Sequence, residues 1–256
     1  MKITEIFKKW PSNTIATAKW FSKIGISRQL LHSYCKLNLI ERIDHGCYKK
    51  SGENIDWPGA IYAIQNQLDL FIHPSGYTSL DLLGIRHHLS VQNRKNIHLS
   101  GLPLTVPPRW LLKNDFGVDF VYKTSHIFNN QNFLIDKIFS KNYSIKISSL
   151  ENSLFEILED INDSNSFEDA ANIIESIINF NEKNIQNVFK NCTSFKVKRI
   201  FLFLIKYFSK PIFTKISYTE SDLGSGIFQI ISNGKFDSEF KITVPKNFKQ
   251  EGKNPF

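Results

Sequence analysis

The residues best suited to chemistry lie within ten positions near the start of the chain, and their types favour binding over catalysis. They carry hydroxyl, amide, imidazole and basic groups: Ser27, Arg28, Gln29, His32, Ser33 and Lys36. Such side chains form hydrogen bonds with base edges and ion pairs with phosphates. On a helix they would occupy the face opposite an apolar stripe. That stripe is formed by Leu30, Leu31, Tyr34 and Leu37. The spacing therefore predicts a surface that contacts double-stranded DNA.

The elements that position this surface have clear boundary signals. A first helix with apolar residues at helical spacing ends at Pro11. Thr17 can cap a second helix, which Gly25 stops, and Ser27 can cap a third that ends at Asn38. Two helices joined by a short turn containing glycine are typical of a helix-turn-helix.

A two-stranded wing is predicted directly after the third helix. Strand 39–43 is followed by a turn at 44–46 and by strand 47–50. His45 stands at the tip, and Arg42 and Lys49 flank it. These three residues are expected to hold the sugar-phosphate backbone of the DNA.

The charge distribution supports a polyanionic partner for this segment. The formal net charge of the 256 residues is +8, with a sequence pI near 9.2. Residues 1–50 contain ten Lys or Arg and three Asp or Glu, so ten minus three gives +7. Nearly the whole excess thus lies in the first fifth of the chain, as expected for a nucleic-acid-binding module joined to a body with another task.

The remaining sequence predicts an intracellular protein with a mixed body. Three cysteines without a C-x-x-C pair suit a reducing compartment, and no apolar run is long enough to span a membrane. Since the first residues do not resemble a signal peptide, we expect a cytoplasmic protein. The fold class is α+β, with a winged helix-turn-helix domain at residues 1–50 and a second domain at residues 55–256. The latter has a helical segment near 149–208 and a terminal β-hairpin.

Two details of the second domain are predicted from local signals. Ser166 is expected to cap the helix that begins near it, with Asp169 completing a capping box. Asn233-Gly234 is expected to form the hairpin turn between strands 227–232 and 240–244.

Catalytic and metal-binding motifs do not occur in the sequence. The spacing of His73, His87, His88 and His98 does not suit a metal site, and we expect no enzyme activity, metal or cofactor. The segment Ser221–Gly226 is interpreted as a plain loop rather than a phosphate cradle. The basic cluster of Lys196, Lys198 and Arg199 is either a solvated helix face or a second contact surface for DNA or an acidic partner.

Motifs along most of the chain resemble the AbiEi antitoxin family. They begin with G-I-S-R-x-x-L-x-x-Y at 25–34 and L-I-E-R-I-x-x-G-x-Y at 39–48. Others include G-Y-T-S-L-D-L-L-G at 76–84, K-V-K-R-I-F-L at 196–202 and D-L-G-S-G at 222–226. The resemblance implies an antitoxin of an abortive-infection system, which serves in phage defence. It further implies repression of the protein's own operon at inverted repeats, and neutralisation of a nucleotidyltransferase-like toxin by direct or indirect means.

Two other functions remain open from the sequence. One is a stand-alone winged-helix transcriptional regulator whose second domain senses a ligand or forms oligomers. The other is a nucleic-acid enzyme, which would require clustered acidic residues near a lysine, and the sequence shows no such cluster.

Overall fold

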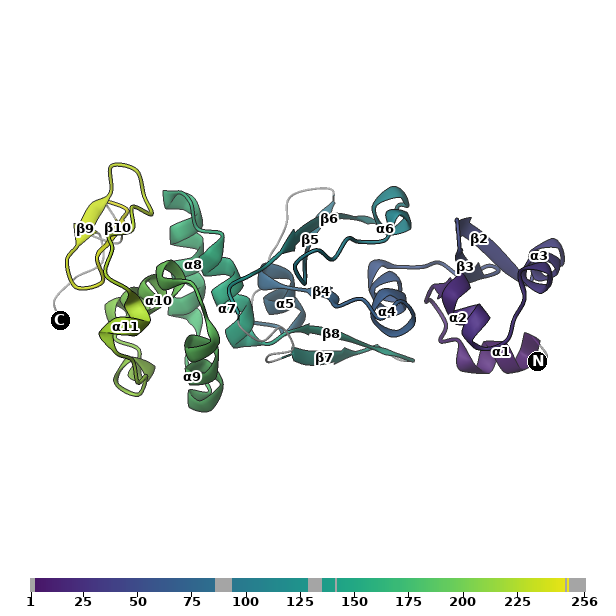
Figure 1. Ribbon diagram of the computed structural model, residues 1–256, viewed down its shortest axis with the longest axis horizontal. Helices are drawn as coiled ribbons and strands as arrows, with labels where there is room; N and C mark the ends of the chain where they lie inside the picture. The colour runs from purple at the N-terminus through teal and green to yellow at the C-terminus, as the bar shows by residue number, and fades with distance from the viewer. Residues whose placement is uncertain (1–2, 86–93, 129–134, 141, 247, 249–256) are drawn as a thin grey trace. The chain divides into compact units, whose positions relative to one another are not determined.

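The chain folds into two compact units (Figure 1). The computed structural model describes residues 3–85, 94–128, 135–140, 142–246 and 248. The first unit comprises Met1–Thr78, His88–Ser125 and Asp136–Ile147, and the second comprises Ser79–His87, His126–Ile135 and Ser148–Phe256. Helices and strands occur in both units, so the protein is α+β, as predicted.

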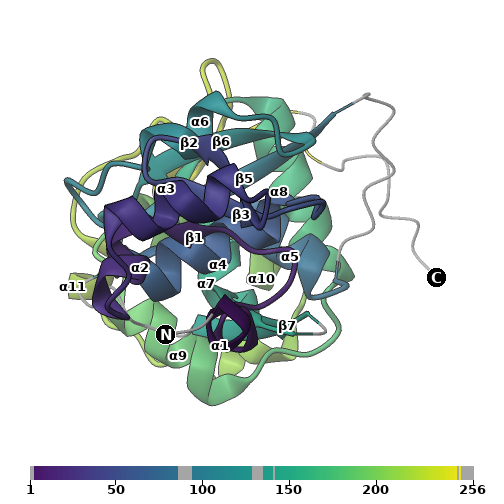
Figure 2. The ribbon, with the colours of Figure 1, turned by 90° about the vertical axis from the view of Figure 1, so that its right-hand side faces the viewer.

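The first unit begins with the predicted helices and wing. The helices are α1 (Ile3–Lys9), α2 (Ala18–Lys23) and α3 (Arg28–Lys36). The strands are β1 (Ala16–Thr17), β2 (Ile40–Asp44) and β3 (Cys47–Lys50), arranged in the antiparallel order β1-β3-β2. Figure 2 looks onto this region with α3 toward the viewer. The two-residue strand β1 was not predicted, because so short a strand carries no periodic signal.

Local capping explains where these helices begin and end. The Thr17 hydroxyl accepts a hydrogen bond from Trp20 N at 3.2 Å, and the Ser27 hydroxyl accepts one from Leu30 N at 3.2 Å. Between the two helices Gly25 adopts a φ of +81°, which favours glycine. All three predicted boundary residues are therefore confirmed.

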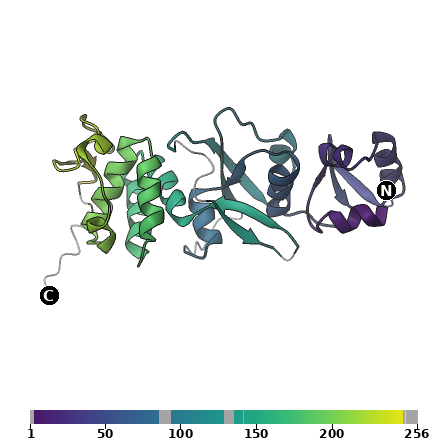
Figure 3. The same ribbon diagram turned by 60° about the horizontal axis from the view of Figure 1, so that its bottom comes forward.

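The rest of the first unit consists of small sheets and short helices. Strand β5 (Lys95–Gly101) pairs antiparallel with β4 (Ile72–Pro74) and parallel with β6 (Val118–Thr124). A second ribbon joins β7 (Ile135–Phe139) and β8 (Ser144–Ser148), as Figure 3 shows. The helices are α4 (Trp57–Gln67) and α6 (Arg109–Lys113), while α5 (Gly76–Leu82) crosses from the first unit into the second.

Helix α4 packs tightly against the winged helix within the first unit. A Cβ placed on Gly59 would lie 2.0 Å from the Asn13 carbonyl oxygen, which precedes β1. The Asn13 amide N–H also donates to the Glu53 carboxylate at 2.8 Å. Only glycine permits this approach of α4, so position 59 is fixed by packing.

The second unit is mainly helical. Its helices are α7 (Leu150–Glu159), α8 (Ser164–Ser176), α9 (Glu182–Asn191), α10 (Phe195–Tyr207) and α11 (Glu220–Leu223), with a 3-10 turn at Pro211–Thr214. Figures 1 and 3 both show α7 to α10 gathered into a bundle. Phe155 of α7 and Phe201 of α10 meet in its core with ring centroids 5.0 Å apart, both fully buried.

The predicted cap of α8 is wrong by three residues. Asp163 is the N-cap, and its carboxylate accepts from Ser166 N at 2.7 Å. The Ser166 hydroxyl in turn accepts from Asp163 N at 3.2 Å, which completes the capping box. The aspartate carboxylate takes the cap position, so Ser166 becomes the third helical residue.

The terminal hairpin is present, but Asn233-Gly234 does not join its strands. Strand β9 (Lys235–Asp237) pairs antiparallel with β10 (Ile242–Val244) across residues 238–241. In the turn Phe240 N donates to the Asp237 carboxylate at 2.8 Å. Asn233-Gly234 instead bends the chain into β9. The preceding segment is not a strand of the hairpin; it forms a parallel bridge between Phe228 and Ile242, and Ile231 bonds with the Thr243 hydroxyl.

Among the described residues, no helix is both long and apolar enough to cross a membrane.

Candidate nucleic-acid interface

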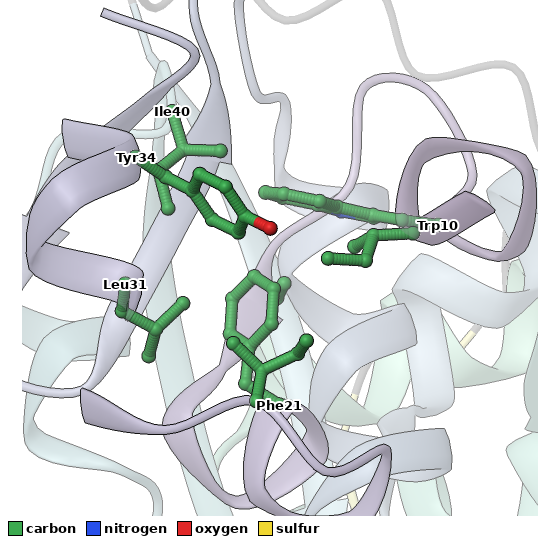
Figure 4. Packing of buried hydrophobic residues seen from close by; sticks show 8 residues of the cluster. Trp10, Phe21, Leu31, Tyr34 and Ile40 are labelled. Atoms are coloured by element: carbon green, nitrogen blue, oxygen red, sulfur yellow. The ribbon is translucent and has the colours of Figure 1, made fainter. Parts of the chain in front are cut away.

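Helix α3 is held in place by its apolar side. Leu31 and Tyr34 are buried in a core that also contains Trp10, Phe21 and Ile40, and their side chains converge in Figure 4. The Trp10 and Phe21 rings meet edge to face, with centroids 5.6 Å apart. This packing fixes which side of α3 faces solvent. Leu37, expected in the apolar stripe, is 67% exposed because the helix has ended at Lys36.

The opposite side of α3 carries all six predicted contact residues. The exposed side chains are Ser27, Arg28, Gln29, His32, Ser33 and Lys36. The Ser33 hydroxyl bonds back to the Gln29 carbonyl oxygen at 3.1 Å, and the Ser27 hydroxyl caps the helix. The helix thus presents amide, imidazole and two cationic groups on one exposed face, a composition suited to base edges and phosphates.

The wing tip is organised by hydrogen bonds around Asp44. Its carboxylate accepts from His45 N at 2.6 Å, and its carbonyl oxygen accepts from Arg42 Nε at 3.2 Å. Arg42 Nη2 lies 3.1 Å from His45 Nδ1. Because a guanidinium only donates, this contact requires Nδ1 of His45 to accept. Arg42 and His45 are both exposed, so the tip presents a cation and an imidazole.

The charge of Asp44 is stabilised by its surroundings. The pKa of its carboxyl lies below the ordinary value, chiefly because the backbone amide of His45 donates to it. The segment 109–114 lowers this pKa further, through the charges of Lys113 and Arg109 and a hydrogen bond from the Asn114 side chain. Asp44 therefore stays ionised and holds the turn through that hydrogen bond.

Lys49 is less available than the other predicted wing residues. It is half-buried and forms an ion pair with Glu41 at 3.1 Å. Its ammonium group also donates to the Glu53 carbonyl oxygen at 3.0 Å. To reach a phosphate, Lys49 would have to leave these partners. The structure places it on the side of the wing that faces residues 53–56.

The expectation of a second contact surface at the start of α10 is contradicted for Lys198 and Arg199. They are 5% and 1% exposed, respectively. Lys198 pairs with Asp222 at 3.5 Å, and Lys196 donates to carbonyl oxygens of Glu159 and Ile161. Lys198 and Arg199 are therefore too buried to reach a partner molecule, while Lys196 is half-buried and bonded within the unit.

Arg199 holds the glycine-rich segment that follows α11. Its guanidinium donates to the carbonyl oxygens of Leu223 at 2.8 Å, Gly224 at 2.7 Å and Gly226 at 2.5 Å. These carbonyls point toward a cation, whereas a phosphate cradle would present backbone N–H groups. The geometry does not suit a phosphate cradle. The prediction of a plain loop is wrong for Ser221–Leu223, which belong to α11, and the loop begins only at Gly224.

No group of three or more His, Cys, Asp or Glu side chains could hold a metal ion within the part of the chain that the structure describes. His87 and His88 lie outside the described residues. The three cysteines are free thiols. Burial raises the pKa of Cys47 to about 12 and that of Cys192 to about 11, so these thiols stay protonated and are poor nucleophiles.

Two exposed cations of α6, Arg109 and Lys113, are not among the residues predicted from the sequence. Two prolines precede this helix, and prolines usually mark a break in a helix. The available signal was a basic pair at i and i+4 directly after Pro108, which places both residues on one helical face.

Two family models match the chain, and both describe AbiEi antitoxins. Residues 94–245 match a family model described as "Transcriptional regulator, AbiEi antitoxin, Type IV TA system". Residues 1–91 match one described as "Transcriptional regulator, AbiEi antitoxin N-terminal domain". No curated protein matches the chain.

Among solved structures, the crystal structure of the RV2827C protein from Mycobacterium tuberculosis is similar. The identity is 9% and the TM-score is 0.53, over 94% of this chain and 89% of that chain. At this identity the likeness shows a shared fold alone. Together the two family models cover nearly the whole sequence, and the chain belongs to the AbiEi family of transcriptional regulators, the antitoxins of type IV toxin–antitoxin systems.

Proposed function

We propose that this protein represses its own operon by binding inverted repeats upstream of it. The observation that carries the proposal is the exposed polar face of α3, with its six hydrogen-bonding or basic side chains. In this proposal Arg28, Gln29 and His32 contact base edges in the major groove, and Lys36 contacts phosphate. Ser27 and Ser33 assist from the same face. Arg42 and His45 at the wing tip bind the backbone, with Lys49 joining if it leaves Glu41.

We further propose a division of labour along the chain. Residues 1–50 would bind DNA, while residues 55–256 would counteract a nucleotidyltransferase-like toxin encoded alongside. The family description as a type IV antitoxin supports this second activity. The protein would act by binding, with no catalytic residue, metal or cofactor. The proposal covers neutralisation of the toxin by direct contact as well as by an indirect route.

An electrophoretic mobility shift with DNA from upstream of the gene tests the DNA-binding part. The assay uses the full chain, two salt concentrations and an excess of unrelated competitor DNA. A shift that resists competitor supports site-specific binding. A shift that competitor abolishes rejects the autorepressor proposal.

Co-expression with the neighbouring gene tests the antitoxin part. Growth arrest by that gene alone, relieved by the full chain, supports neutralisation. The double variant Arg28→Ala, Lys36→Ala should relieve toxicity as well as the wild type does, since its changes are confined to α3. An operator-binding protein that relieves no toxicity would be a stand-alone transcriptional regulator.

A further inference from the structure

Helix α6 of the first unit lies close to the tip of the wing. Asn114, which follows α6 directly, lines a surface hollow of about 590 Å³ together with Ile43 of β2 and Lys49 of β3. The charges of Lys113 and Arg109 also act on the carboxyl of Asp44 in the wing turn. The wing and α6 thus lie close together although residues 51–108 separate them in the sequence.

Packing orients the cations of α6 toward solvent. Trp110 and Leu111 are 8% and 0% exposed and fasten the helix to the unit. Arg109 and Lys113 stand one turn apart on the other face, and both are exposed. Across the described residues, neither forms an ion pair or a side-chain hydrogen bond.

The acidic residues nearby offset this charge only in part. The Asp44 carboxylate attracts Arg109 and Lys113 but carries a single negative charge. Asp115 and Asp119 both pair with Arg94, at 2.5 Å and 3.6 Å. The exposed cations Arg42, Arg109 and Lys113 therefore surround the wing turn with a net positive charge. This positive charge is complementary to a polyanion that contacts the wing and extends past it.

We propose that Arg109 and Lys113 of α6 bind phosphates of the same DNA duplex, beside the segment held by the wing. This inference rests on the proposed operator binding and extends the DNA-binding surface beyond residues 1–50. The wing would lie along the backbone, and α6 would contact the phosphates next to it. These contacts would add affinity without reading sequence, because phosphates are the same at every step.

The test compares three double variants of the full chain on the upstream DNA by fluorescence anisotropy across a salt series. The α6 variant is Arg109→Gln with Lys113→Gln. The control is Lys183→Gln with Lys190→Gln, two exposed lysines of α9 in the second unit, which changes the net charge equally. The third is Arg28→Gln with Lys36→Gln on α3. Thermal unfolding verifies that each variant is folded.

Loss of two phosphate contacts should reduce the magnitude of the slope of log K against log salt by about 1.8. A fourfold rise in salt would then cost the α6 variant about twelvefold less affinity than it costs the wild type. Hydroxyl-radical footprinting should show lost protection at the flank of each half-site and unchanged protection at its centre.

An α6 variant that matches the α9 control in slope and footprint overturns the inference. If the α3 variant is impaired in that same experiment, the proposed operator binding stands without α6. If the wild type itself binds no upstream DNA specifically, the proposed function and this inference fail together.

Discussion

Gln67, at the end of α4, bonds to the backbone on both sides of the first residue of β1. Thr17 N donates to Gln67 Oε1 at 2.7 Å, and Gln67 Nε2 donates to the Ile15 carbonyl oxygen at 2.9 Å. The amide thereby pairs with the strand as a neighbouring strand would. Thr17 and Gln67 are 2% and 7% exposed, so water cannot replace these bonds.

Removing this amide should destabilise the first unit. Gln67→Ala leaves a buried N–H and a buried carbonyl without partners, which is expected to lower the free energy of unfolding by about 2–3 kcal/mol. Urea unfolding measures the change. The control is Asn66→Ala, because Asn66 is exposed and bonds only within α4. Equal stability of the two variants would contradict the argument.

The cationic residues of α3 should govern the salt dependence of DNA binding. Arg28→Ala with Lys36→Ala removes two exposed positive charges, so fewer counterions are released on binding. We expect weaker binding and a salt slope smaller in magnitude by up to about 1.8. Anisotropy titrations at several salt concentrations measure both. An unchanged affinity and slope would remove α3 from the interface.

Substitutions of Ser27 should separate helix capping from DNA contact. Ser27→Ala loses the bond from Leu30 N and should cost about 1 kcal/mol of stability. Ser27→Asp retains a capping oxygen, so it should preserve stability, but its negative charge should weaken DNA binding. Unfolding and anisotropy measurements on both variants test this pattern. Ser27→Asp binding DNA as tightly as wild type would place Ser27 away from the backbone.

Arg199 should be among the most sensitive positions of the second unit. Arg199→Met fills much of the same space but leaves the carbonyls of Leu223, Gly224 and Gly226 without their donor. The expected loss in free energy of unfolding is at least about 3 kcal/mol. The control Lys190→Met alters an exposed side chain of α9 and should be close to neutral. A loss below about 1 kcal/mol would show that water satisfies these carbonyls.

Asp222 should make stability depend on pH in the acidic range. Its pKa is lowered, first by the hydrogen bond from Thr219 N and also by Lys198. A lowered folded-state pKa means that the stabilisation is complete above the ordinary aspartate pKa, about 3.9. The stabilisation is lost as pH falls through the folded value.

Urea unfolding between pH 5 and pH 2.5 measures this dependence. Asp222→Asn should have a flatter profile than wild type, whereas Asp169→Asn, on the exposed side of α8, should keep the wild-type profile. Parallel profiles for wild type and Asp222→Asn would show that this carboxylate does not couple folding to protonation.

The sequence alone determined the features that depend on neighbours along the chain. Thr17, Gly25 and Ser27 mark helix boundaries because capping bonds and positive φ angles involve residues within three positions. The exposed face of α3 follows from the same helical periodicity. The family resemblance likewise arose from ordered motifs, and the family models confirm it.

Tertiary structure decided what distant residues do to one another. Asn233-Gly234 has the composition of a hairpin turn, yet β9 pairs with β10 across residues 238–241, and Gly234 lies against the Val244 carbonyl oxygen of β10. Lys198 and Arg199 look like a basic surface in sequence, but both are buried. Lys198 pairs with Asp222, and Arg199 donates to the carbonyls of Leu223, Gly224 and Gly226. The pairing of Gln67 with Thr17 and the approach of α6 to the wing turn join residues 50 or more positions apart. Burial and charge compensation depend on which segments meet in space, and no local pattern carries that information.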